Sequence, residues 1–253
     1  MNICQTFKDL AQKTWDMLAT SRAVSYPMQE ETFTDLHLLH LKQHHPEVKI
    51  VNFTKPQEGV NGADWEWWFK LPDSSWIGYR VQAKVLDVRT EEFAQLYYQK
   101  DKSSVSQCDK LIAAAKADKS NPCIPLYVLY LQTDAHAPSV HSEHGCSLVS
   151  AYEIRAAKGV KGKAMADWYK DIIPWHELVC PIVKDSKTWH NSIDRFLDRQ
   201  SISPKKESIE QYRLEAPPGY ILQGMNTELG LAIAESNPHD IAGAVIFDLF
   251  TSA

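Results

Sequence analysis

The stretch NGADWEWWF, residues 61–69, is followed after a short turn by GYRVQAKVL, residues 78–86. Both segments are rich in aromatic and β-branched residues, and LPDSS (71–75) between them is typical of a loop, so they predict two antiparallel strands joined by a tight turn. Each strand carries a charge that is costly inside a sheet: Asp64 begins the first, and Lys84 lies near the end of the second. Because an antiparallel pair brings these two ends together, we expect the two charges to lie side by side.

A third polar residue, Gln82, belongs to the same group. It lies two residues before Lys84, so both side chains are expected on one face of their strand, and 82 − 64 = 18 residues separate it from Asp64. A carboxylate and an amide oxygen form the hard-oxygen site that Mg²⁺ prefers. Lys84 would position a water molecule that attacks phosphorus and would offset the charge that develops there. The hairpin therefore predicts a site for Mg²⁺ or Mn²⁺.

The segments around this hairpin have the periodicities of further helices and strands. They are helices at 4–23 and 30–45, strands at 48–54, 63–70 and 76–86, helices at 91–99 and 104–117, and a strand at 123–132. The last of these is a nearly continuous apolar run, which is typical of a strand buried on both faces. Helices that flank a mixed sheet in this order predict an α/β fold.

The pattern weakens after residue 132. It predicts helices at 147–157, 164–172 and 187–199, a polar linker at 201–208 and a final strand at 242–250. We expect three parts: an N-terminal helix (1–27), a core (28–135) and a mainly helical C-terminal extension packed on that core (136–253).

Composition narrows the class of protein. The formal net charge is −5 in 253 residues, so the chain lacks the global basic excess of many nucleic-acid-binding proteins, although a local basic surface is compatible with it. No apolar stretch approaches the roughly 20 residues needed to span a bilayer, and the first residues do not resemble a secretory signal. The five cysteines are scattered: Cys4, Cys108, Cys123, Cys146 and Cys180. Their odd number and irregular spacing favour reduced thiols and a cytoplasmic location.

The motifs GAD (62–64) and QAK (82–84) resemble the core of the PD-(D/E)XK nuclease superfamily. The strand GYRVQAK (78–84) is similar to that of the Mrr-type restriction endonucleases, in which glutamine replaces the usual acidic residue. The resemblance implies a restriction-endonuclease-like core over residues 30–132 and metal-dependent hydrolysis of phosphodiester bonds, with DNA as the expected substrate. The chain departs from the superfamily pattern at Ala63, where proline is usual, and at Gln82, which removes one metal-binding charge.

The resemblance also assigns roles. Asp64 and Gln82 would bind the metal, and Lys84 would orient water and stabilise the transition state. An acidic residue on the first core helix often completes such sites; Glu31 is the first candidate, with Glu30 and Asp35 as alternatives. Three accessory candidates are Glu58 and Glu66, which flank Asp64 in sequence, and Gln107, at the start of the helix after the lysine strand. For each of these three, the alternative is a side chain that simply faces solvent.

A narrower resemblance extends over most of the chain. It is carried by QEGVNGADWEWW (57–68), PLYVLY (125–130), GCSL (145–148) and PWHELVC (174–180), which are similar to a bacterial family associated with phage defence. This implies a defence effector with a partner protein from the same system, and leaves open whether the chain forms an oligomer. Two alternatives stay open: a non-catalytic member that binds nucleic acid or a protein, and an effector that cleaves RNA, including tRNA.

Two histidine groups could bind zinc. One is His37, His40 and His44, at helical spacing; the other is His136, His141, His144 and Cys146 within the loop 136–146. A solvated helix face and a plain loop are the more common explanations of such patterns. The tryptophans could stack on bases, but packing in the core or at its rim is the more common role, and Trp76 is the first candidate for an exposed ring.

Overall fold

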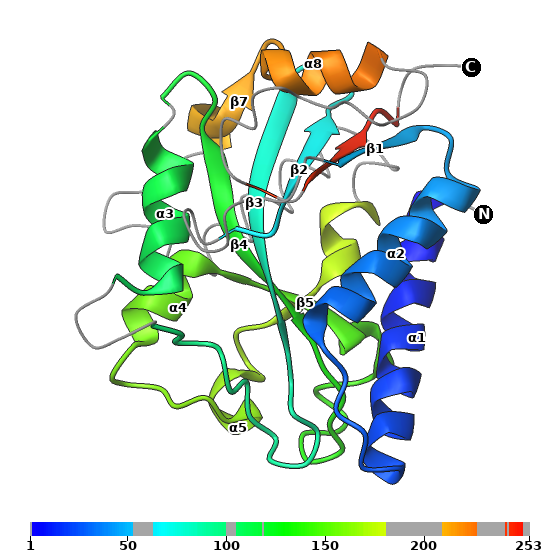
Figure 1. The fold of residues 1–253 in the computed structure, drawn as a ribbon, viewed down its shortest axis with the longest axis vertical. Coiled ribbons are helices and arrows are strands. Elements are labelled where there is room, and N and C mark those ends of the chain that lie inside the picture. Colours follow the sequence, from blue (N-terminus) through cyan, green and yellow to red (C-terminus); the bar gives the residue numbers. More distant parts are fainter. Residues whose placement is uncertain are drawn as a thin grey trace.

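A computed structural model describes most of the chain. The described residues are 2–52, 63–99, 105–117, 119–180, 209–226, 241 and 243–249. They form a mixed α/β fold in which an eight-stranded sheet lies between helices (Figure 1).

The sheet has the order β1-β8-β2-β3-β4-β5-β6, and β7 pairs with the beginning of β3. The strands are β1 (Val48–Asn52), β2 (Trp65–Lys70), β3 (Trp76–Val85), β4 (Cys123–Tyr130), β5 (Cys146–Ser150), β6 (Ile173–Pro174), β7 (Arg213–Leu214) and β8 (Gly243–Phe247). The pairs β2–β8 and β3–β4 are parallel, and the other pairs are antiparallel. The sheet is therefore mixed, as the sequence predicts.

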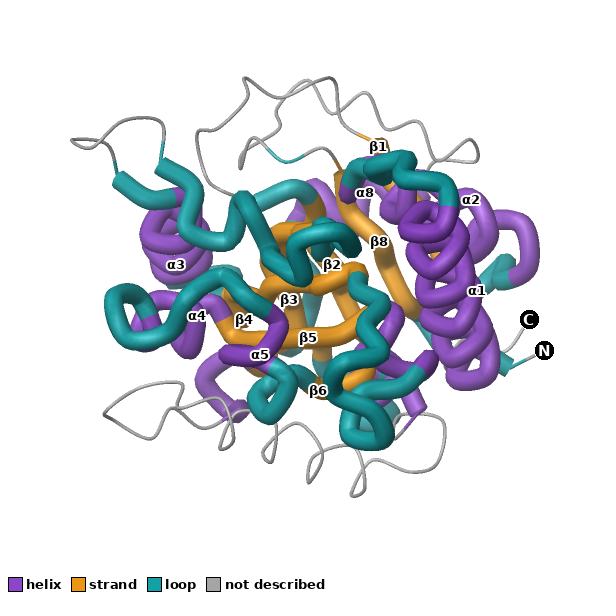
Figure 2. The backbone as a smooth tube through the Cα atoms, turned by 90° about the horizontal axis from the view of Figure 1, so that it is seen from below, coloured by secondary structure: helices purple, strands orange, loops and turns teal. Residues whose placement is uncertain are grey.

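Helices cover both faces of the sheet. They are α1 (Ile3–Ala23), α2 (Glu30–His44), α3 (Gln107–Ala117), α4 (Ala151–Ala157), α5 (Met165–Trp168) and α8 (Gly219–Asn226), with 3₁₀ turns η1 (Ser142–Gly145), η2 (Trp175–Leu178) and η3 (Ile209–Tyr212). Figure 2 shows the sheet between α1 and α2 on one side and α3 and α4 on the other. Among the described residues, no helix is both long and apolar enough to cross a bilayer.

The two faces of β2 explain why its sequence is so aromatic. Trp67 points toward α1 and α2, where it packs with Trp175 at 6.2 Å between ring centroids. Trp68 points to the opposite face and is fully buried in a second cluster with Ile221 of α8. Its ring lies over Gly78 of β3, where a Cβ atom would come within 2.6 Å of the indole. Glycine is therefore required at this position near the start of β3 for the tryptophan to pack against the strand.

Most predicted elements are confirmed, with small shifts at their ends. The apolar run at 123–132 forms β4, and all eight of its residues are buried. The predicted helix at 91–99 is wrong: Glu91 has a positive φ of 56°, and its carbonyl and the amide of Phe93 bond to the distant segment 163–165. The predicted helix at 147–157 is half wrong, because residues 147–150 pair with β4 as part of β5. The predicted elements at 187–199 and 201–208 lie outside the described residues.

The C-terminal part of the chain is built into the central sheet as well as packed on it. It contributes β5 to β8 to the same sheet, and β8 lies between β1 and β2. The strands β1, β2 and β3 are therefore not a simple meander, because a strand from the other end of the chain separates the first two. Trp76 is only 5% exposed, so the expectation of an exposed ring is wrong.

The cysteines also differ from expectation. Cys4 and Cys180, which are 176 residues apart, form a disulfide between the start of α1 and the end of the described segment after η2. Cys108, Cys123 and Cys146 are free and buried. The expectation of five reduced thiols is therefore wrong for one pair. Because disulfides are rare in a reducing cytosol, the cytoplasmic location loses this support and stays a prediction.

A buried ion pair joins β2 to β3. Glu66 and Arg80 are opposite each other in the ladder, 3.0 Å apart between Oε1 and Nε, and their side chains are 0% and 2% exposed. The other carboxylate oxygen accepts hydrogen bonds from Trp68 Nε1, at 2.9 Å, and from the Tyr220 hydroxyl. The carboxylate therefore links the hairpin to α8, and its lone pairs are well satisfied, as a buried charge requires.

We predict that Glu66→Ala lowers the free energy of unfolding by about 3–5 kcal/mol, because it leaves Arg80 buried without its charge partner. The double variant Glu66→Leu with Arg80→Met should recover much of that loss, since it removes both charges together. Lys8→Ala, which breaks a part-exposed pair with Glu143, is the control and should cost under about 1 kcal/mol. Urea denaturation measures all three, and a single Glu66 variant as stable as the control would contradict the prediction.

Candidate active site

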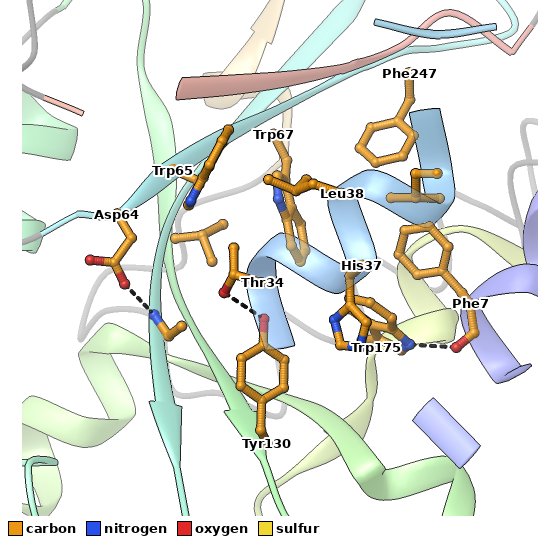
Figure 3. Close-up of a pocket in the computed structure, with 13 residues that line it drawn as sticks. Phe7, Thr34, His37, Leu38, Asp64, Trp65, Trp67, Tyr130, Trp175 and Phe247 are labelled. Atoms are coloured by element: carbon orange, nitrogen blue, oxygen red, sulfur yellow. Dashed lines mark hydrogen bonds between the residues drawn. The ribbon is translucent and has the colours of Figure 1, made fainter. Parts of the chain in front are cut away.

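Asp64 lies at the point where β2 begins. Because Trp65 is paired with Val81, Asp64 comes level with Gln82 on β3. Its Oδ2 accepts hydrogen bonds from the backbone N–H of Ala83, at 2.9 Å, and from Gln82 Nε2, at 2.6 Å. Figure 3 shows the first of these bonds crossing from Asp64 to the next strand. The structure thus brings Asp64 and Gln82 together, with the carboxylate held against β3.

Lys84 is buried at the same end of β3, with its side chain only 6% exposed. Its Nζ lies 3.6 Å from Oε1 of Glu30, the first residue of α2. The helix thus supplies an acid next to the lysine, which is the arrangement expected of the first core helix.

The acid that α2 supplies is Glu30 rather than the first candidate, Glu31. The side of α2 that packs on the sheet carries Phe33, His37 and Leu41, and Glu30 lies three residues before Phe33 on the same side. Neighbouring residues of an α-helix are about 100° apart around its axis, so Glu31 turns away and is exposed. The i, i+3, i+7 spacing was visible in the sequence and would have favoured Glu30. The other alternative, Asp35, is exposed as well.

The charge on Asp64 is poorly tolerated without a further cation. Burial raises the pKa of Asp64 from 3.8 to about 6, and the negative charge of Glu30 acts in the same direction. The hydrogen bond from Ala83, the positive charge of Lys84 and the hydrogen bond from Gln82 lower it, but they do not offset the burial. The carboxyl group therefore has a strong preference for either a proton or a positively charged ligand.

One polar atom beside Asp64 needs a ligand. Gln82 is 2% exposed, and its Oε1 has no hydrogen-bond partner among the described residues. A buried acceptor without a partner costs about 1–3 kcal/mol. Because the amide nitrogen is engaged by Asp64, the oxygen is left to accept from a donor or to bind a cation. The donor chemistry of Asp64 and Gln82 fits Mg²⁺ or Mn²⁺, which also bind water as ligands.

A metal site at Asp64 and Gln82 would have few carboxylate ligands. In the described part of the chain, no group of three or more His, Cys, Asp or Glu side chains is placed to hold a metal ion. A metal at Asp64 and Gln82 would therefore complete its shell with water, backbone oxygens or the substrate.

The three accessory candidates, Glu58, Glu66 and Gln107, differ in what the structure shows around them. Glu66 is engaged by Arg80, Trp68 and Tyr220, so its carboxylate is committed to the structure of the hairpin. Gln107 begins α3, and its Oε1 is buried with no hydrogen-bond partner among the residues that the structure describes. Glu58 lies outside the described residues.

The histidines predicted as alternative zinc ligands have other roles. His37 is buried and hydrogen-bonded to the Thr14 hydroxyl at 2.9 Å, and burial lowers its pKa to about 3, so it is a neutral core residue. His40 packs on His44, with 4.4 Å between the ring centroids. In the loop, His136 stacks on Tyr169 at 4.5 Å. Neither group is a metal cluster among the described residues.

Comparison with known proteins places the whole chain in one family. The chain belongs to a family of unknown function (DUF6615), whose model matches residues 3–248. The match runs from α1 to the residue after β8, so the hairpin, the acid of α2 and the C-terminal strand are parts of one family unit. A search of curated proteins found no match.

We predict that Asp64→Asn stabilises the metal-free protein at pH 8 by about 2 kcal/mol. The raised pKa means that the native state binds a proton at Asp64 more tightly than the unfolded state does. The stability that this protonation gives to the wild type is fully present below pH 3.8 and is lost as the pH rises through about 6. A shift of this size corresponds to roughly 3 kcal/mol, and partial exposure reduces it. The stability gained by Asp64→Asn should disappear near pH 4.

Thermal melts between pH 4 and pH 8 test this, with Asp87→Asn as a control of opposite sign. The hydrogen bond from Arg89 lowers the pKa of Asp87 to about 2, so this carboxylate stabilises the fold above pH 3.8. Its asparagine variant should therefore melt at a lower temperature at pH 8. Equal melting temperatures for wild type and Asp64→Asn at pH 8 would contradict the burial of this charge.

Proposed function

We propose that this protein is a metal-dependent nuclease of the PD-(D/E)XK type that hydrolyses phosphodiester bonds of nucleic acid, with DNA as the preferred substrate. The observation that carries the proposal is the convergence of Asp64, Gln82, Lys84 and Glu30 where β2, β3 and α2 meet. Such an arrangement is costly for stability alone, because it buries a lysine and leaves an amide oxygen without a partner among the described residues.

The order of elements supports a restriction-endonuclease-like core. From α2 to β4 the chain runs helix, three strands, helix, strand, and β3 and β4 are parallel neighbours. The insertion of β8 between β1 and β2 is an addition to that order. It leaves the β2–β3 junction, where the candidate residues lie, unchanged.

The proposed roles follow from position. Asp64 and Gln82 Oε1 would hold Mg²⁺ or Mn²⁺, which supplies Lewis acidity and offsets negative charge at phosphorus. Lys84 would donate hydrogen bonds from Nζ to the attacking water and to a phosphate oxygen, and its charge would stabilise the transition state. Glu30, at 3.6 Å, would hold that ammonium group at the junction.

A second candidate is a non-catalytic protein of the same fold that binds nucleic acid or a protein. It is favoured by Gln82, which replaces a metal-binding charge, and by the lack of a three-carboxylate group among the described residues. RNA or tRNA is the alternative substrate, because the proposed chemistry does not depend on the sugar. The sequence resemblance to a phage-defence family supports a role as a defence effector with a partner protein.

We predict that Lys84→Ala reduces Mg²⁺- or Mn²⁺-dependent cleavage by about 10²–10³-fold or more, because one preorganised electrostatic contact is worth this much in rate. The fold should persist, since burying a lysine costs hydration and rotamer freedom. Plasmid, linear DNA and tRNA are the substrates, and the melting temperature is recorded in parallel. Lys49→Ala, an exposed lysine in β1, is the control and should cleave like wild type. A Lys84 variant that cleaves normally and melts far lower would make this residue structural.

We also predict that Mg²⁺ binds more tightly to Gln82→Glu than to wild type, by several-fold, because the affinity of oxygen sites rises with the number of charged ligands. Asp64→Ala should abolish the binding. Isothermal titration calorimetry measures both, with Glu143→Gln, whose carboxylate pairs with Lys8, as a control. Unchanged Mg²⁺ affinity in both site variants would place the metal elsewhere or remove it from the proposal.

A further inference from the structure

A groove of about 350 Å³ lies beside the candidate active site. Its walls come from three segments: the end of α1 with residues 27–30, the end of β3 with residues 85–89, and residues 94–95. None of these residues has a role in the proposed reaction except Glu30. The groove is therefore a feature of the molecule that the reaction itself does not explain.

The groove is continuous with the candidate site. Glu30 lines it and pairs with Lys84 at the same time. Val85, the residue after Lys84, also lines it. A molecule in the groove would therefore lie one side chain away from the lysine proposed to act on phosphate.

The chemistry of the walls suits a flat, partly polar molecule. Leu86 and Val88 are 1% and 7% exposed and form an apolar floor together with Met28. Arg89 stands at the rim with a side chain that is 52% exposed. Asp87 holds its guanidinium by two hydrogen bonds, at 3.1 Å to Nε and 2.8 Å to Nη2, so the cation has a defined position.

The volume limits the ligand. Small-molecule sites span about 300–1,000 Å³, so this groove is at the lower end and has no room for a duplex. Enzymes that do chemistry on a base accommodate one unstacked nucleotide in a fitted pocket, which shows that a pocket of this kind can hold a nucleotide of a strand. An apolar floor fits the face of a base, the carboxylate of Glu30 can accept a hydrogen bond from an amino group of the base, and Arg89 fits a phosphate.

We infer that this groove binds a single unstacked nucleotide, with its base on the Met28–Leu86 floor and its phosphate at Arg89. Its link to cleavage rests on the proposed nuclease function; its binding of a nucleotide does not. The nucleotide has two sources, a residue of the strand that is being cut or a free mononucleotide. Both share the chemistry of a base joined to a phosphate.

The test fills the groove and measures binding without cleavage. Ala94 is an exposed groove residue, and Ala94→Trp places an indole where the base would lie. Ala156→Trp, at an exposed position of α4 that does not line the groove, is the matched control. Both are made in full-length Asp64→Asn protein and titrated with a short fluorescent single-stranded DNA and with fluorescent AMP. We expect Ala94→Trp to weaken binding about tenfold, which is within the contribution of one stacked base, and Ala156→Trp to leave it unchanged.

The two titrations distinguish the two possible sources of the nucleotide. Weaker binding of both ligands supports a groove that takes a free nucleotide, and weaker binding of the DNA alone supports a nucleotide held as part of a strand. No binding of either ligand by the Asp64→Asn parent protein, or equal effects of the two tryptophans, would overturn the inference. A loss of cleavage in Lys84→Ala bears on the nuclease function only, so the two proposals can fail separately.

A second variant tests the inference even if Ala94→Trp does not fold. Arg89→Gln removes the charge at an exposed position, and it should weaken the binding of AMP several-fold while leaving that of adenosine unchanged. Equal affinity of this variant and its parent for AMP would remove the phosphate contact and, with it, the assignment of the ligand as a nucleotide.

Discussion

The antiparallel register of β2 and β3 is the constraint on which both the core and the candidate site depend. It places Glu66 opposite Arg80 and brings Asp64 level with Gln82, so one ladder positions a structural ion pair and, two rungs away, a candidate metal site. A slip of one residue would exchange the two faces of the strand, and Trp68 would lose its place over Gly78. The packing of the tryptophan and the position of the candidate ligands are therefore set by the same pairing.

The charges at the junction become understandable when they are counted together. With both carboxyl groups ionised, Asp64 and Glu30 carry two negative charges against one positive charge on Lys84. Burial is the main cause that raises the pKa of Asp64, and the negative charge of Glu30 adds to it, while the positive charge of Lys84 lowers it. A bound divalent cation would reverse this balance and satisfy Gln82 Oε1 as well. The same groups that weaken the metal-free fold thus make a good environment for a cation, which is a common compromise at functional sites.

The sequence predicted what depends on local periodicity. Alternation along one strand placed Gln82 and Lys84 at the same junction, and a turn signal brought Asp64 to them. The helical spacing that favours Glu30 over Glu31 was present but was not used. The sequence could not predict what depends on distant pairing: β8 enters between β1 and β2, and Cys4 bonds to Cys180, because no local pattern identifies a partner 176 residues away. Residues 91–99 look helical by composition, yet their backbone bonds to residues 163–165 hold them in turns.

These distant contacts matter for the site because they support the hairpin from its other side. β8 pairs with β2 along Trp65 to Phe69, so the strand that begins at Asp64 would have an open edge without it. Tyr220 of α8 donates to Glu66, two rungs from Asp64 and Gln82. The candidate residues fall within α2, β2 and β3, but the strand that carries Asp64 is held in place by the C-terminal part of the chain. The fold around the candidate site therefore includes β8 as a structural member, although that strand supplies no residue to the proposed chemistry.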